Sequence, residues 1–313
     1  MIDVSVVIVN WNVKELLTDC IQSIIDTTKD LSYEIIVIDN ASTDGSLQYL
    51  NEKFPSITLI SNEENLGFAK ANNQGFRIAK GKYIYILNPD TIISKNNIQI
   101  LTSYLETHPH VGAVGPRVVT LDDKIQKSCA RKLPTLKKVF FMDILQLKLI
   151  PWLGPIIEKN LRYPYNYEVE QEIEAGVGAA LMIRKSVLFK IGLFYAEFLH
   201  GGEDNFLCHK LKQEGNQLVY IPSTTIIHYT AESVKQSNIR SSVNNCLSNG
   251  LYFRLKGGQT QYFLFKFMMR WVYVPPRIIS LLMKKILRVV SEREFNDQWS
   301  VLLGIFKWEE ING

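Results

Sequence analysis

The sequence predicts an α/β fold in which a mostly parallel central sheet is flanked by helices and followed by a C-terminal helical appendage. Two observations support this fold class. Continuous apolar, β-branched runs such as residues 4–9 alternate with segments whose apolar residues recur at helical spacing. Between residues 233 and 291 the chain instead carries ten Lys and Arg and no Asp or Glu. We therefore expect one α/β domain over residues 1–232 and a basic helical region over residues 233–313.

Strands and helices alternate regularly through the first part of the domain. The apolar runs predict strands at residues 4–9, 34–39, 57–60, 83–87 and 111–115. Helical spacing predicts helices at residues 13–26, 67–81 and 94–107, and a shorter helix around Leu47 and Leu50 with Ser42 or Thr43 as its N-cap. Such alternation gives right-handed βαβ units, and their ligands bind beyond the carboxyl ends of the strands.

The rest of the domain has a less regular pattern. Short strands are predicted around residues 117–121 and 124–132, before an apolar and basic stretch that contains prolines. Residues 175–194 then resume as a strand and a helix. A helix over residues 203–215 and strands at 217–222 and 224–229 complete the domain.

Composition and short motifs exclude several classes of protein. Apolar residues make up 46% of the 313 residues and aromatic residues 11%, which is typical of a globular protein. The four cysteines are scattered without a CxxC pair, and no basic region precedes the first apolar run. We therefore expect a cytoplasmic protein rather than a secreted, disulfide-bonded one. Neither GxGxxG nor GxxxxGK[ST] occurs, which argues against a Rossmann dinucleotide site and a P-loop.

Polar side chains follow three of the predicted strands: Asn10 and Asn12 the first, Asp39 the second, and Asn88 and Asp90 the fourth. In "YILNPDT" a spacing of two places Asn88 and Asp90 on the same side of an extended segment. Their oxygens would suit a hard cation such as Mg²⁺ or Mn²⁺. The alternative interpretation is a turn, because Asn, Pro and Asp all favour turns.

The sequence resembles glycosyltransferase family 2, in particular the rhamnosyltransferase-like bacterial branch that builds cell-surface polysaccharides. The matching stretches occur in the family's order over roughly residues 3 to 230: "VSVVIVNWN", "IIVIDNASTDGS", "NEENLGFAKANNQG", "YILNPDT", "VGAVGPRVV", "GAALMIRKSVLFKIGLF", "GEDNFLCHKLKQEG" and "IIHY". The resemblance implies a GT-A fold with a Rossmann-like sheet. It also implies a nucleotide-sugar donor, a divalent cation and transfer with inversion at the anomeric carbon.

The resemblance also assigns roles to the donor side of the site. Asn88 and Asp90 match the family's metal-binding DxD element, written here as NPD, and His228 matches a histidine that completes the metal shell. Asp39 matches the aspartate that binds the nucleobase or ribose. Further residues that would line the donor pocket are Val9, Asn10, Asn12, Asn65, Gly67, Phe68, Lys70 and Asn73. Capping, turn-forming or solvated roles are the alternative for each of these residues.

Glu203 and Asp204 form a second candidate group, at the start of a predicted helix. In the family an acidic pair at this place holds the general base, and Asp204 maps to it. Adjacent carboxylates raise each other's pKa, which helps a base that removes a hydroxyl proton. Acidic residues in a first helical turn are also favoured by the helix dipole, which is the structural alternative. The preceding "LHGG" departs from the family's usual F-x lead-in to this pair.

The basic region has its own pattern. Residues 259–290 are rich in aromatic residues and leucine, and a basic residue interrupts them every few positions. No uncharged run reaches the roughly 18 to 20 residues that span a bilayer. The pattern favours an interfacial helix on anionic lipid, anchored by Trp271 and Tyr273. The alternatives are a helical appendage packed on the domain or an oligomer interface, and nucleic acid is not expected because no recognition motif is present.

These observations together predict an inverting, metal-dependent glycosyltransferase at the inner face of a bacterial membrane. It would move a sugar from a dTDP- or UDP-linked donor, dTDP-rhamnose being favoured, to a hydroxyl of a surface polysaccharide or lipid-linked precursor. One alternative is a nucleotidyltransferase, which would need a Gly-rich, Arg-containing loop after the first strand, where the chain reads "NWNVKELL". The other is a non-catalytic glycan- or membrane-binding relative, against which Asp39, Asp90 and Asp204 argue.

Overall fold

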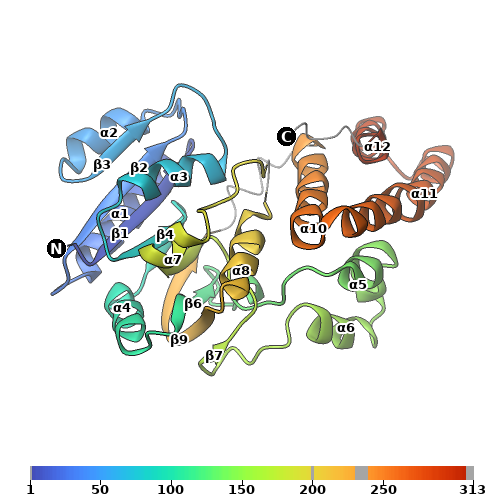
Figure 1. Cartoon of the computed structure of the whole chain (residues 1–313). Coiled ribbons are helices and arrows are strands. Elements are labelled where there is room, and N and C mark those ends of the chain that lie inside the picture. Colours follow the sequence, from blue (N-terminus) through green and yellow to red (C-terminus); the bar gives the residue numbers. More distant parts are fainter. Residues whose placement is uncertain (1, 199–200, 230–238, 308–313) are drawn as a thin grey trace. The chain divides into compact units, whose positions relative to one another are not determined.

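The computed structural model describes residues 2–198, 201–229 and 239–307 (Figure 1). The chain forms two compact units. The first comprises Met1–Leu133, Tyr163–Ala196 and Glu203–Glu232, and the second comprises Pro134–Arg162, Glu197–Gly202 and Ser233–Gly313. The second unit therefore includes a segment from the middle of the chain in addition to the basic C-terminal region.

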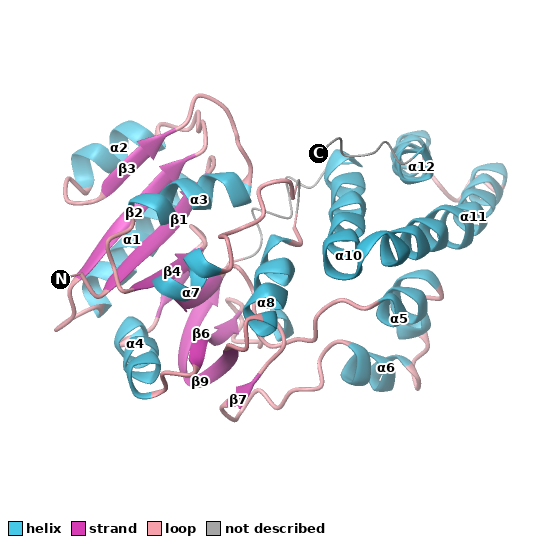
Figure 2. Ribbon diagram, viewed as in Figure 1, coloured by secondary structure: helices cyan, strands magenta, loops and turns pink. Residues whose placement is uncertain are grey.

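A nine-stranded sheet forms the centre of the first unit, within the described residues (Figure 2). The strand order is β3-β2-β1-β4-β8-β6-β9-β5, and β7 pairs with β9. The strands are β1 Val4–Asn10, β2 Tyr33–Asp39, β3 Thr58–Ser61, β4 Tyr83–Leu87, β5 Thr91–Ile93, β6 Val111–Val119, β7 Gln171–Glu172, β8 Ala180–Arg184 and β9 Gln217–His228.

The first four strands of this order, β3, β2, β1 and β4, are parallel, as the βαβ pattern predicts. β8 then runs antiparallel between β4 and β6, while β6 and β9 are parallel. β6 joins two runs that were predicted as separate strands, and so does β9. The strand predicted over residues 124–132 is wrong, because Lys127–Cys129 forms a 3₁₀ turn in which the Cys129 N–H donates to the Gln126 carbonyl at 3.0 Å.

The helices of the first unit pack apolar faces on this sheet. They are α1 Lys14–Thr27, α2 Ser46–Lys53, α3 Phe68–Ile78, α4 Asn97–Thr107, α7 Lys185–Lys190 and α8 Glu203–Gln213. The predicted Ser42 or Thr43 cap of α2 is wrong, because Asp44 instead accepts from the Ser46 N–H at 3.0 Å. α3 ends before Gly81, where a Cβ atom would lie 2.4 Å from the Ser5 amide nitrogen.

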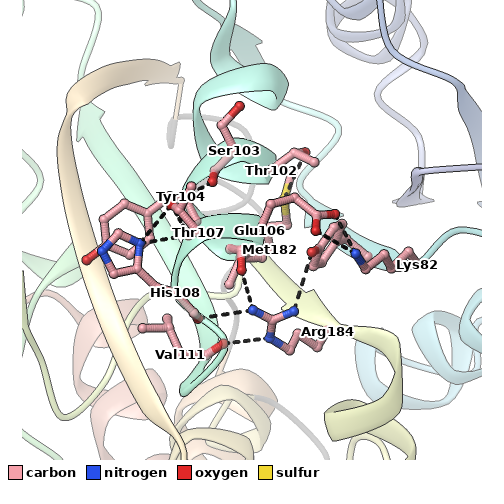
Figure 3. A network of polar contacts seen from close by, with 12 residues as sticks. Lys82, Thr102, Ser103, Tyr104, Glu106, Thr107, His108, Val111, Met182 and Arg184 are labelled. Atoms are coloured by element: carbon pink, nitrogen blue, oxygen red, sulfur yellow. Dashed lines mark hydrogen bonds and ion pairs between the residues drawn. The ribbon is translucent and has the colours of Figure 1, made fainter.

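Arg184 ties the end of α4 to the sheet (Figure 3). Its guanidinium donates to the carbonyls of His108 at 3.1 Å and Val111 at 2.8 Å, and also to that of Leu105. Leu105 lies in the last turn of α4, whose carbonyls have no partner inside the helix. A charged donor therefore satisfies the end of α4 and fixes that helix against β8 and β6.

The second unit is helical. Its elements are α5 Leu136–Lys138, the π-helical η2 Val139–Ile144, the 3₁₀ turn η3 Leu147–Leu149, α6 Gly154–Leu161, α10 Ile239–Phe267, the π-helical η4 Met268–Tyr273, α11 Val274–Ile286 and α12 Glu292–Lys307. α10 breaks at Gly257 and Gly258, and Gly258 has a φ of +70°. Among the described helices, none is both long enough and apolar enough to span a bilayer.

Candidate active site

Most of the predicted site residues lie at one edge of the sheet in the first unit. Asn10 ends β1 and pairs in register with Asp39 at the end of β2. Asn88 directly follows β4, and its backbone N–H donates to the Ala179 carbonyl at 3.0 Å, just before β8 begins. Neighbouring strands lie about 4.8 Å apart, so the ends of β2, β1, β4 and β8 span roughly 14 Å. One extended ligand can reach across this edge.

Asp39 is buried, with only 2% of its surface exposed, and both of its carboxylate oxygens are engaged. Asn10 donates from Nδ2 to Oδ1 at 2.7 Å, and the Ser42 N–H donates to Oδ2 at 3.0 Å. The second bond, from an N–H three residues further on, holds the turn that follows β2. The turn interpretation and a ligand-binding role are compatible here, because a carboxylate oxygen has more than one acceptor position.

The loops after β1 and β2 are bonded to each other. Asn12 has a positive φ of 56°, its side-chain Oδ1 accepts from the Thr43 N–H at 2.7 Å, and its own N–H donates to Ser42 Oγ at 3.0 Å. Val9 is buried one residue before the end of β1. The structure therefore fixes the shape of the pocket wall that Val9, Asn10 and Asn12 were predicted to form.

The next loop is held by two asparagines. Asn40 donates from Nδ2 to Asn65 Oδ1 at 2.8 Å, and Asn65 Oδ1 also accepts from the Gly67 N–H at 2.9 Å. Gly67 has a φ of +80°, so a residue with a side chain would be strained there. Lys70 lies exposed in the first turn of α3.

Asn73 is placed differently from the other predicted donor-binding residues. Its side-chain Nδ2 donates to the Phe194 carbonyl at 2.8 Å, and its Oδ1 accepts from the Phe194 N–H at 3.1 Å. Both ends of this buried amide are thus used to hold the segment after α7. We therefore assign Asn73 a structural role and do not carry it forward as a donor-binding residue.

The buried carboxylate of Asp90 lacks hydrogen-bond partners among the described residues. It is 3% exposed, and neither of its carboxylate oxygens has a hydrogen-bond partner among the described residues. His228 Nε2 lies 3.2 Å from Oδ1, but the contact does not have hydrogen-bond geometry. A buried carboxylate without donors is costly unless a cation or proton compensates it. Asp90 is therefore the strongest single indication of a ligand in the first unit.

Gln126 determines how His228 faces Asp90. Its Nε2 donates to the His228 carbonyl at 3.0 Å, so its Oε1 must be the atom that accepts from His228 Nδ1, also at 3.0 Å. Nδ1 therefore carries a hydrogen, and a neutral His228 presents the lone pair of Nε2. That nitrogen lies 3.2 Å from Asp90 Oδ1 and accepts a hydrogen bond from Asn88 Nδ2 at 3.4 Å, which a bound cation would replace. A histidine oriented in this way by a second residue is typical of metal ligands.

These side chains fit a divalent cation bound together with its substrate. In the described part of the chain no group of three His, Cys, Asp or Glu side chains gathers at one point. The protein would thus supply Asp90 and His228, and also the oxygen of Asn88 once its amide is rotated, because Nδ2 is the atom that faces His228, while a diphosphate and water complete the coordination. Such a partly open site is usual for cations that bridge phosphates.

Asp204 lies in the first turn of α8 and forms a salt bridge with Arg131. Arg131 Nη2 contacts Asp204 Oδ2 at 2.7 Å, with side chains that are 12% and 17% exposed, and Arg131 Nη1 donates to Asn205 Oδ1 at 2.6 Å. Gly178 packs closely against this group, because a Cβ atom at Gly178 would lie 3.6 Å from both Asp204 Cβ and Phe68 Cε1. The next residue, Ala179, is the one that holds Asn88.

Glu203 differs from Asp204 in its environment. Burial, and then the negative charge of Asp204, raise the pKa of Glu203 to about 8, well above its ordinary range. The acidic pair therefore consists of one carboxyl that stays protonated near neutral pH and one carboxylate that is held by Arg131. The preceding Gly201 and Gly202 have φ values of +70° and +99°, so their backbone conformation also requires glycine.

Sequence reasoning missed Gln126, Arg131 and Gly178. Gln126 and Arg131 lie in a segment that was predicted to be a strand, and no spacing or periodicity marks them. A glycine between apolar residues in "AGVGAAL" was the one available signal for Gly178, because such glycines often mark a close approach of other groups.

Comparisons with known proteins identify the family of the chain. A sequence model described as Glycosyl transferase family 2 matches residues 5–188. Over 217 residues the chain is 27% identical to N-acetylglucosaminyl-diphospho-decaprenol L-rhamnosyltransferase of Mycobacterium tuberculosis, covering 64% of this chain and 67% of that protein.

Solved structures share the fold. GalNAc-T7 with UDP, GalNAc and Mn²⁺ matches with a TM-score of 0.59 and 18% identity, over 87% of this chain and 56% of that one. The mannosyltransferase PcManGT from Pyrobaculum calidifontis, in complex with GDP-Man and Mn²⁺, matches with a TM-score of 0.54 and 16% identity, over 97% of this chain and 86% of that one.

Proposed function

Because this chain belongs to glycosyl transferase family 2, and is thus a glycosyltransferase with a GT-A fold, we propose that it uses a nucleoside diphosphate sugar and a divalent cation. The acceptor in this proposal is a hydroxyl of a lipid-linked or polysaccharide glycan. The observation that carries the proposal is Asp90, whose two buried oxygens have no hydrogen-bond donor among the described residues and whose Oδ1 lies 3.2 Å from His228 Nε2. A cation between Asp90, His228, Asn88 and the donor diphosphate would satisfy all of these groups.

In this proposal Asp39 binds the nucleoside part of the donor. Asn10 and the Ser42 N–H hold its carboxylate in one orientation, which leaves further lone pairs for a ribose hydroxyl or a base N–H. The cation supplies charge neutralisation for the diphosphate leaving group. In the proposal Lys70, which is exposed at the start of α3, adds a positive charge on the donor side.

Asp204 is the proposed general base. It takes the proton of the acceptor hydroxyl while that oxygen attacks the anomeric carbon, and the bond to the diphosphate oxygen breaks with its electron pair leaving on the diphosphate. A single displacement of this kind inverts the anomeric carbon. Arg131 holds Asp204 in place, and Glu203, protonated near neutral pH, adds no second negative charge beside it.

The sugar is proposed to be rhamnose, carried by a dTDP-linked donor. The support for this is the name of the mycobacterial relative, an L-rhamnosyltransferase acting on a decaprenol-linked acceptor. UDP- and GDP-linked sugars are the competing donors, because the solved structures with the same fold bind UDP or GDP-Man. A lipid-linked acceptor places the proposed reaction at the inner face of the membrane.

The test is release of free nucleoside diphosphate from a panel of dTDP-, UDP- and GDP-sugars, with and without Mn²⁺, in the presence of a polyprenyl-diphosphate-sugar acceptor. We expect Mn²⁺-dependent release with one donor. Asp204→Asn should lose turnover but keep the donor-dependent rise in melting temperature, and Asp19→Asn, an exposed control on α1, should keep both. Unchanged turnover in Asp204→Asn would remove Asp204 from its role.

A further inference from the structure

An exposed apolar stripe runs along the helical path that leads from the end of α10 through η4 into α11. Its members are 49% to 78% exposed, and we call them the apolar stripe: Phe263, Phe267, Trp271, Ile279, Met283 and Ile286. Most are separated by four or eight residues. In a regular α-helix four residues make slightly more than one turn, so residues at this spacing move gradually around the helix axis. The π-helix η4 has more residues per turn, which offsets this movement and keeps the stripe residues on one side.

The opposite side of the same path is packed. Phe265, Met269, Val274 and Leu281 are at most 7% exposed. Phe265 also lies 5.0 Å, between ring centroids, from Phe253 of the first half of α10. One side of this path therefore forms the core of the second unit, and the apolar stripe is a second, separate apolar face.

Isolated exposed apolar residues are ordinary on a protein surface, but a continuous stripe marks an interaction site. From Phe263 to Ile286 the stripe spans roughly 35 Å at 1.5 Å per residue. Single clefts for small ligands are shorter and concave. The length and linear form of the stripe therefore favour an extended partner surface.

The positive charge of the region that contains the stripe favours an anionic partner. Between residues 233 and 291 the chain has ten Lys and Arg and no Asp or Glu. Two copies joined through this face would bring these like charges together. Glu292, which begins the adjoining α12, already lies 3.4 Å from Lys285 within one copy. An anionic bilayer instead attracts Lys and Arg, accepts an apolar helix face at its surface, and favours Trp at the headgroup level.

We infer that the apolar stripe lies flat on an anionic membrane surface, with Trp271 at the headgroup level. This inference rests on the proposed function, since it accounts for how the enzyme meets a lipid-linked acceptor. Of the two expected anchors it keeps Trp271, because Tyr273 is half-buried and the Arg277 guanidinium lies 3.6 Å from its ring centroid.

The test is flotation of the full chain with lipid vesicles, without any sugar donor. Wild type should bind vesicles of phosphatidylcholine and phosphatidylglycerol, and bind pure phosphatidylcholine vesicles at least about tenfold more weakly. The triple variant Ile279→Gln, Met283→Gln and Ile286→Gln should lower the partition coefficient by about tenfold or more, because it removes apolar area that the bilayer would bury.

A matched triple variant controls for loss of exposed apolar surface in general. Ile25, Ile78 and Leu121 are 38%, 42% and 64% exposed in the first unit, and their replacement by Gln should change binding less than about twofold. Equal flotation of the stripe variant and wild type would overturn the inference. So would a wild-type dimer that becomes monomeric in the stripe variant and does not float, because the partner would then be a second copy.

The outcome is separable from that of the proposed function. The stripe residues belong to the second unit, and donor release by the wild type does not enter the flotation assay. A wild type that releases nucleoside diphosphate but does not float with anionic vesicles would refute only the membrane inference. Flotation without release from any donor would refute only the proposed function.

Discussion

Replacing Asp90 by asparagine should make the metal-free protein more stable and remove its response to a cation. Both oxygens of Asp90 are buried without a donor among the described residues, and His228 Nε2 lies 3.2 Å from Oδ1. A buried, unsatisfied charged group costs more than the roughly 1 to 3 kcal/mol of a neutral one. The substituted amide would carry no charge, and its Nδ2 could donate to the His228 lone pair.

We expect the Asp90→Asn variant to gain about 2 kcal/mol, which raises the melting temperature by roughly 4 to 8 °C for a unit of this size. Scanning calorimetry in a chelator measures this gain. In excess Mn²⁺ with a nucleoside diphosphate, wild type should rise in melting temperature and the variant should not, because ligands stabilise only the state that binds them.

Asp44→Asn provides a control of opposite sign. Partial burial raises the pKa of Asp44, but hydrogen bonds from Ser46 and from the backbone N–H of Lys14 outweigh this effect and hold the pKa below its ordinary value. Neutralising Asp44 should therefore destabilise the protein at neutral pH. The reasoning about Asp90 is refuted if Asp90→Asn is less stable than wild type in chelator, or if it keeps the full Mn²⁺ response.

Three further predictions concern charged groups of the first unit. Arg131→Ala should lower turnover by about tenfold or more, because Asp204 then loses the guanidinium that holds its carboxylate at 2.7 Å, and Arg131→Lys should restore part of the loss; release of nucleoside diphosphate measures both. The wild type should lose stability as the pH rises from about 4.5 to about 8, because in this range the unfolded state has released the Glu203 proton and the folded state still holds it. Glu203→Gln should remove this loss, which denaturant melts at several pH values measure. A variant that keeps the wild-type pH dependence would contradict the assignment. Arg184→Ala should cost roughly 3 kcal/mol in a denaturant melt, since it leaves buried carbonyls at the end of α4 without a donor, whereas Arg77→Ala, which removes only a 3.4 Å contact from an exposed side chain, should cost less than about 1 kcal/mol.

The strands that carry the donor side could be predicted from the sequence because their residues are buried on both faces. The apolar runs of β1, β2 and β4 gave their bounds to within one residue, and the polar residues that follow these strands meet at one edge of the sheet. The metal-binding role of the NPD segment came from its resemblance to the family's DxD element, because the spacing of Asn88 and Asp90 is equally compatible with a turn. A local pattern was sufficient for these strands because neighbouring parallel strands run in the same direction, so the residues that follow them meet at the same edge of the sheet.

Features that depend on non-local pairing could not be predicted in this way. The antiparallel insertion of β8 between β4 and β6 and the single long β9 follow from pairing partners far away in the chain. Gln126 and Arg131 act through side chains that meet His228 and Asp204, about 70 to 100 residues further on. Nothing in their neighbours along the sequence distinguishes them from surface residues.

The central claim is that Asp39, Asp90 and Asp204 serve one nucleoside diphosphate sugar at one edge of the sheet. Anomalous diffraction from crystals grown with Mn²⁺ and a nucleoside diphosphate tests it most directly. We predict a manganese peak within coordination distance of Asp90 and His228, in density continuous with a diphosphate whose nucleoside reaches Asp39. A manganese peak elsewhere, or a nucleotide bound away from Asp39, would contradict the account.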